Sequence, residues 1–101
     1  MAAEEKLKLV TIVTEAVLEA GITTTLKKLG ATGYTITDAR GSGSRGVRDA
    51  GWSSSGNVRI EVICNPEVAE KITTHMREHF YENYAMIIFI ADVGVLRPGK
   101  F

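Results

Sequence analysis

Two segments near the ends of the chain alternate like β-strands and carry apolar residues on both of their faces. The first runs from Leu7 to Val13, and the second runs from Tyr84 to about Leu96. Successive strand residues point to opposite faces of a sheet, so a strand that is apolar on both faces must be covered on both sides. A chain of 101 residues has room for one compact unit. We therefore expect a single domain over residues 1–101 that is built around these two strands.

Two helices are expected between these strands. Apolar residues recur at helical spacing over residues 15–29, with Thr14 as the expected N-cap and Gly30 as the stop. Asn65-Pro66-Glu67 is a typical helix start, because Asn caps, Pro tolerates the first helical position and Glu suits the helix dipole. The apolar stripe of this second helix consists of Val68, Ile72, Met76 and Phe80.

Two further strands complete the pattern, one from Gly33 to about Arg40 and one from Asn57 to Cys64. The order strand, helix, strand, strand, helix, strand predicts an α+β, ferredoxin-like βαββαβ fold. Its four-stranded antiparallel sheet would carry both helices on one face, and residues 96–101 would form a short tail. Because the outer strands are apolar on both faces, we expect other copies of the chain to cover the second face in a small homo-oligomer.

Residues 41–56 interrupt this pattern with ten Gly or Ser residues among sixteen. A connection of this length inside a compact domain is usually functional or disordered, so we expect a long loop. The whole chain balances twelve Lys and Arg against twelve Asp and Glu, but residues 40–59 hold four Arg and one Asp, a net charge of +3. The neutral total gives no argument for a nucleic acid or a membrane surface as partner, whereas the loop segment is basic.

The start of the loop, Gly41 to Gly46, matches the G-x-G-x-x-G pattern of dinucleotide-binding domains. That reading is rejected, because no helix follows to receive a pyrophosphate at its N-terminus. Glycine N–H groups can still form an anion nest, and the guanidinium groups of Arg45 and Arg48 can pair with phosphate oxygens. Phosphate recognition and a plain solvated linker are equally compatible with this composition.

Three other features invite a functional reading. His75 to His79 matches the H-x-x-E-H metalloprotease pattern, but a third protein ligand is missing, so a solvated helix face is expected and no metal site. Cys64, the only cysteine, ends a strand and is expected to be a small buried hydrophobe. Trp52 lies in the most polar part of the chain and is expected to contact a partner.

No apolar run approaches the length of a membrane span, and no signal peptide pattern is present, so a cytosolic protein is expected.

Four short segments together resemble the PII-like signalling proteins, over nearly the whole chain. They are Val13-Thr14-Glu15, Gly30-Ala31-Thr32-Gly33-Tyr34-Thr35, Gly43-Ser44-Arg45-Gly46-Val47-Arg48, and Tyr84-Ala85 leading into Ile87-Ile88. Within that family the segments are most similar to the SbtB group, whose members regulate the sodium-dependent bicarbonate transporter SbtA in cyanobacteria. The G-S-R-x-V-R element is the most specific of the four.

The resemblance implies a homotrimer that binds adenine nucleotides, namely AMP, ADP, ATP and cyclic AMP, in clefts between subunits. The long loop at residues 41–56 corresponds to the family's T-loop. Phosphate contacts would come from Gly41, Gly43, Ser44, Arg45 and Arg48. Adenine and ribose contacts would come from Thr35 and from the main chain near Ile63 and Met86. Partner contacts through the T-loop would come from Val47, Asp49 and Trp52.

The same resemblance implies no catalytic residues and no metal ligands. The protein would be cytoplasmic and would associate reversibly with the membrane through SbtA, and whether a divalent cation accompanies ATP stays open. Ile87 stands where general PII proteins use a phosphate-binding lysine, and the loop has no tyrosine, so 2-oxoglutarate sensing and tyrosyl modification are not expected. The alternatives are a PII-like regulator of another target and a weak nucleotide hydrolase.

Overall fold

A computed structural model describes residues 5–43, 46–48, 56–97, 99 and 101 of the chain. Six strands and two α-helices follow one another along these residues, with a short 3-10 turn, Ala16–Leu18, before the first helix. The elements are β1 (Glu5–Glu15), α1 (Glu19–Lys28), β2 (Thr35–Ala39), β3 (Gly41–Gly43), β4 (Gly46–Arg48), β5 (Asn57–Cys64), α2 (Pro66–His79) and β6 (Met86–Val95).

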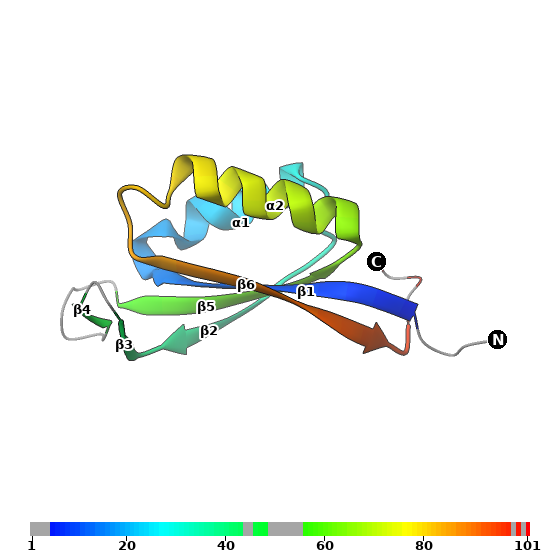
Figure 1. Cartoon of the computed structure of the whole chain (residues 1–101), viewed down its shortest axis with the longest axis horizontal. Coiled ribbons are helices and arrows are strands. Elements are labelled where there is room, and N and C mark those ends of the chain that lie inside the picture. Colours follow the sequence, from blue (N-terminus) through cyan, green and yellow to red (C-terminus); the bar gives the residue numbers. More distant parts are fainter. Residues whose placement is uncertain (1–4, 44–45, 49–55, 98, 100) are drawn as a thin grey trace.

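Four of the strands form one antiparallel sheet in the order β2-β5-β1-β6. Both α-helices lie on the same face of this sheet, and the opposite face carries no helix in the described part of the chain (Figure 1). The long central strand β1 pairs with β5 on one side and with β6 on the other, so that Val10 lies opposite both Val62 and Ile90. The predicted ferredoxin-like fold is confirmed.

The core lies between the sheet and the two helices, because even-numbered residues of β1, β5 and β6 point toward the helix layer. Ile12 and Ile60, which are register partners, are fully buried there. The core cluster consists of Val10, Ile12, Ile22, Leu26, Val58, Ile60, Val62, Cys64, Val68, Ala69, Ile72 and Met76. Cys64 is therefore the buried hydrophobe that the sequence predicts, and burial raises the pKa of its thiol.

The ends of the helices confirm two predicted signals. The Asn65 side chain accepts a hydrogen bond of 2.8 Å from the Val68 N–H, which caps α2 as predicted. Gly30 ends the first helical segment with a φ of 107°, a left-handed conformation that glycine adopts without strain.

Thr14 does not cap the first helix, and this prediction is wrong. Pairing between β1 and β5 continues as far as Glu15 opposite Asn57, so Thr14 is a strand residue. Its buried hydroxyl donates to the Ala85 carbonyl at 2.9 Å, and the helical segment begins only at Ala16. Backbone pairing with β5 extends β1 by two residues beyond Val13, the position at which the apolar alternation ends.

Part of the expected loop at residues 41–56 is a second, two-stranded sheet. Strand β3 pairs with β4, with Gly41 opposite Arg48 and Gly43 opposite Gly46. Backbone hydrogen bonds hold such a ladder without apolar alternation, which explains why the side-chain pattern did not predict it.

The face of the sheet away from the helices, which we call the open face, retains exposed apolar side chains. Ile87 is 49% exposed and Phe89 is 46% exposed. Thr11 lies beside Phe89 in the register, is itself fully buried, and has a hydroxyl without a hydrogen-bond partner among the described residues.

None of the described helices is long and apolar enough to cross a membrane.

Candidate functional site

The end of β1 is fastened to the start of β6 by two side-chain hydrogen bonds to one residue. The Thr14 hydroxyl donates to the Ala85 carbonyl oxygen at 2.9 Å, and the Glu15 carboxylate accepts from the Ala85 N–H at 3.0 Å. Both polar groups of the Ala85 backbone are therefore held by neighbouring residues of β1. This pair of bonds, which we call the Ala85 clamp, fixes the backbone immediately before Met86, the first residue of β6.

The same end of the sheet also holds the last residue of the 41–56 segment, Gly56, by a backbone hydrogen bond. The Ala16 N–H donates to the Gly56 carbonyl at 2.9 Å, directly before β5 begins at Asn57. Gly56 has a φ of 70°, which lies in the left-handed region that favours glycine. The end of β1 therefore contacts both the base of the 41–56 segment and the start of β6.

Gly41 is a different case from Gly56. It has no left-handed φ, and a Cβ atom added to it would meet no described atom within 4 Å. The fold of the described chain therefore gives no steric or conformational reason for glycine at this exposed position. A residue of this kind leaves the backbone open to close approach by another molecule.

Two groups of predicted site residues lie on opposite edges of the sheet. Gly41 follows β2, which is one edge strand, whereas Met86 begins β6, which is the other. Three strand spacings separate these edges, roughly 14 Å at about 4.8 Å each. The side chain of Met86 packs against the core, so only its main chain is available at the end of the strand.

Thr35 and Ile63 lie away from the end that holds the Ala85 clamp. Thr35 is exposed at the start of β2 and pairs with Glu61, and Ile63 is half-buried near the end of β5. Ile63 lies five positions after Val58 in β5, a distance of roughly 16 Å along an extended strand, and Val58 pairs with Thr14. Within one chain, the predicted nucleotide contacts that the structure describes are therefore not brought into a single pocket.

The remaining predicted residues belong to the 41–56 segment. Gly43 pairs with Gly46 at the far end of the β3–β4 ladder, and Val47 and Arg48 lie in β4. Ser44, Arg45, Asp49 and Trp52 lie outside the described residues. Arg48 is thus the one predicted arginine whose backbone position is known, opposite Gly41.

The sequence analysis missed the Ala85 clamp. Thr14 was predicted to cap the first helix, and Glu15 was predicted to be the first residue of that helix. A signal was present, because two polar residues directly follow an apolar strand and both belong to one of the segments on which the family resemblance rests. Their partner lies 70 and 71 residues away, which local patterns do not reveal.

No group of three or more His, Cys, Asp or Glu side chains in the described ranges is arranged to hold a metal ion. His75 lies in the C-terminal half of α2, and its ring is 6.3 Å from that of Phe80, which lies 5.9 Å from the ring of Tyr84, the residue before Ala85. The pKa of His75 is lowered by partial burial and by the neighbouring His79, while Glu78 acts in the opposite direction.

Residues 7–100 match the family model for the nitrogen regulatory protein P-II, and the chain belongs to this family. Proteins of this family act in signalling, are generally not enzymes, and typically form trimers.

Three solved structures show the range of similarity. A PII-like signalling protein from Thermus thermophilus is 41% identical, with 97% of each chain covered and a TM-score of 0.83. CPII from Thiomonas intermedia K12, a nitrogen regulatory PII-like protein bound to ADP, AMP and bicarbonate, is 25% identical, with 97% of this chain and 95% of CPII covered and a TM-score of 0.89. GlnK from B. subtilis in complex with ATP, at 16% identity and a TM-score of 0.61, with 92% of this chain and 84% of GlnK covered, shares the fold.

Proposed function

We propose that this protein is a trimeric, cytoplasmic PII-like sensor that binds adenine nucleotides in clefts between subunits and regulates a sodium-dependent bicarbonate transporter of the SbtA type. The observation that carries the nucleotide part is the likeness to CPII, which is bound to ADP and AMP and matches over 97% of this chain. The transporter part is supported by the resemblance of the G-S-R-x-V-R element and its neighbouring residues to the SbtB group.

The arrangement of the edge strands supports a cleft between copies. Gly41 and Met86 lie on opposite edges of the sheet, and Thr35 lies farther along β2. Within one copy, a mononucleotide that contacted both edge strands would have to lie across β5 and β1, the two strands between them. Two copies that meet edge to edge would bring one copy's Gly41 close to the other copy's Met86, and the ligand would lie between them.

The Ala85 clamp gives such a cleft one rigid wall. Adenine and ribose would contact the main chain near Met86 and Ile63 and the side chain of Thr35. Because both polar groups of Ala85 are already bonded to Thr14 and Glu15, the backbone that precedes Met86 is held in place before a ligand arrives. Preorganised main-chain donors and acceptors lower the entropy cost of binding.

The phosphates would be held at the base of the 41–56 segment. Gly41 leaves the backbone accessible, and Arg48 lies opposite it in the β3–β4 ladder. Gly43, Ser44 and Arg45 would add N–H groups, a hydroxyl and a second guanidinium. Nucleotides that differ in phosphate number would engage different subsets of these groups and thereby shift the conformation of the segment. Val47, Asp49 and Trp52 would then meet the transporter in one of these conformations.

Calorimetry with AMP, ADP, ATP and cyclic AMP tests the nucleotide site. We expect the wild type to bind at least one of them, and we expect Arg48→Ala to weaken binding by about 1.5–3 kcal/mol, roughly 10- to 150-fold, because it removes a charge-assisted hydrogen bond. The matched control is Arg77→Ala, which removes the same group from an exposed position on α2 and should leave affinity unchanged.

The outcomes separate the parts of the proposal. A wild-type protein that binds none of the four nucleotides contradicts the sensor function. Normal binding by Arg48→Ala contradicts the phosphate assignment alone. Cosedimentation of the nucleotide-bound protein with vesicles that carry the transporter tests the partner, and equal sedimentation with empty vesicles contradicts it.

The bicarbonate bound together with ADP in CPII favours a second candidate, in which this chain itself senses bicarbonate with a nucleotide. Repeating the ADP titration with and without bicarbonate distinguishes the two. Coupling between two bound ligands is reciprocal, so a higher ADP affinity in the presence of bicarbonate means that ADP also strengthens bicarbonate binding. That result supports direct sensing of bicarbonate by this chain.

A further inference from the structure

Two histidines of α2 form a close pair on the surface of the helix layer. His75 and His79 are four residues apart, and their ring centroids lie 4.2 Å apart with an angle of 31° between the ring planes. Residues at this spacing face the same side of a helix. His75 is half-buried and His79 is exposed, so the pair is accessible to solvent from one side.

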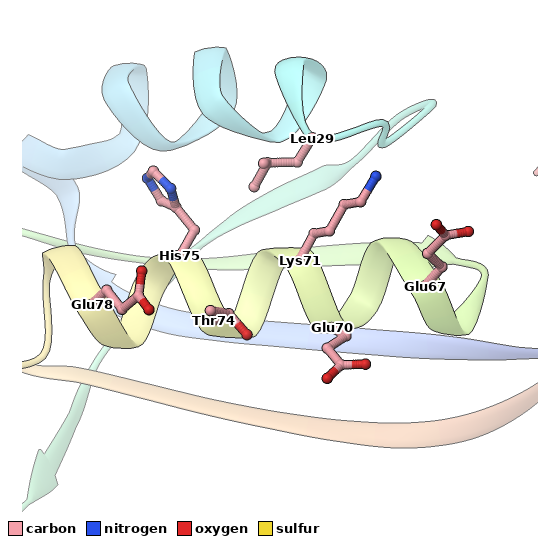
Figure 2. A pocket seen from close by; sticks show the side chains of 7 residues that line it. All are labelled: Leu29, Glu67, Glu70, Lys71, Thr74, His75 and Glu78. Atoms are coloured by element: carbon pink, nitrogen blue, oxygen red, sulfur yellow. The ribbon is translucent and has the colours of Figure 1, made fainter.

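The surroundings of the pair are acidic. A groove of about 400 Å³ between α1 and α2 has His75 near one end, and its wall contains three carboxylates and a single ammonium group. The lining residues are Leu29, Glu67, Glu70, Lys71, Thr74, His75 and Glu78. Figure 2 shows His75 extending from α2 toward α1, with Glu78 at the same end of the groove and Lys71 one turn farther along. An excess of carboxylates raises the local concentration of cations.

Imidazole nitrogens are preferred ligands of Zn²⁺, Cu²⁺ and Ni²⁺, and two histidines at positions i and i+4 of a helix form half of a well-known zinc-binding pattern. We propose that His75 and His79 together bind a divalent transition-metal ion, with water completing its coordination. The acidic groove attracts the cation, and the two imidazoles select a transition metal over Mg²⁺ or Ca²⁺, which require oxygen ligands.

This site differs from the catalytic zinc centre that the H-x-x-E-H pattern suggests. The described residues provide no third ligand, and Glu78 lies beside the pair without belonging to a three-ligand cluster. A metal held by two protein ligands keeps exchangeable positions, which a side chain of another molecule can occupy. The proposal does not depend on nucleotide binding, because neither histidine is among the predicted nucleotide contacts.

Isothermal titration of the full chain with Zn²⁺, at about pH 7.5 where most histidines are neutral, tests the proposal. We expect one Zn²⁺ per chain. His75→Gln and His79→Gln should each weaken binding by more than roughly tenfold, because one imidazole alone loses the advantage of a second ligand held at high effective concentration. Cu²⁺ should bind more tightly than Zn²⁺, and Mg²⁺ should not compete.

Arg77→Gln is the matched control, because it changes an exposed polar residue between the two histidines and leaves both imidazoles in place. Circular dichroism confirms that each variant folds. Zn²⁺ should also raise the melting temperature of the wild type and of Arg77→Gln, and not that of either histidine variant. The proposal is overturned if the wild type binds no Zn²⁺ at millimolar concentrations, or if a single-histidine variant binds as tightly as the wild type.

Discussion

The two faces of the central sheet are made by the same strands but end in different surroundings. On the face toward α1 and α2, Ile12 and Ile60 are fully buried by the chain's own helices. On the open face, Ile87 and Phe89 are about half exposed, although they occupy the same strand as the partly buried Ile88. Both faces of β6 are therefore apolar, and the chain's own helices cover the side of Met86 and Ile88, whereas Ile90 on the same side is 46% exposed.

This difference indicates which contacts belong to folding and which belong to assembly. Full burial of an aliphatic side chain contributes about 1.5–3 kcal/mol, so the helix-covered face provides the main stability of the isolated chain. The open face would gain that contribution if other copies covered it, and members of this family typically form trimers. Substitutions on the two faces should therefore respond differently to protein concentration.

The largest expected effect is that of Ile60→Ala on the covered face. We expect it to lower the free energy of unfolding by about 2–5 kcal/mol, because it leaves a cavity at a fully buried position in the core. Urea denaturation monitored by circular dichroism measures this loss, which should be the same at low and high protein concentration.

Ile87→Ala is the matched control, since it removes the same atoms from a side chain that is 49% exposed. Its cost should be smaller in dilute solution and should grow with protein concentration, as the wild type gains stability from association. Equal costs for the two variants at every concentration would contradict the distinction between the faces.

A second prediction concerns assembly. If the chain forms the trimer that is typical of its family, we expect Phe89→Asp to convert it into monomers of 11.0 kDa at micromolar concentration, because burying an unpaired carboxylate against another copy is unfavourable. Sedimentation velocity measures the change.

Ile90→Asp provides the comparison for this variant. Ile90 is adjacent and equally exposed at 46%, but it points toward the helix side of the sheet. We expect this variant to remain a trimer. If both variants dissociate, or neither does, the open face is not the surface that the copies share.

The fold could be predicted from the sequence where a local pattern determines it. Strand β5 was predicted with the bounds that the structure has, because apolar alternation and the following Asn65 cap mark both of its ends. Gly30 likewise marks the end of the first helix through its left-handed φ. These signals involve residues within a few positions of one another.

The features that escaped prediction depend on distant partners or on the backbone alone. Thr14 was misassigned because its partner, the Ala85 carbonyl, is remote in sequence. The β3–β4 ladder has glycine at three of its six positions and no apolar alternation. The sequence also does not reveal that Gly41 and Met86 lie on opposite edges, since strand order follows from pairing across the sheet.

The smallest predicted effect on the free energy of unfolding comes from Thr11, a buried residue of the open face. Thr11 is fully buried on this face, between Glu61 and Phe89 in the register, and its hydroxyl has no hydrogen-bond partner among the described residues. Because an unsatisfied buried hydroxyl is destabilising, we expect the nearly isosteric Thr11→Val to raise the free energy of unfolding by about 1 kcal/mol in dilute solution, measured by urea denaturation. Val13→Thr, which adds a hydroxyl to the same strand and face, should have the opposite sign. A loss of stability in Thr11→Val that increases with protein concentration would mean that another copy satisfies this hydroxyl, and the open face would then contribute a polar contact as well as apolar area.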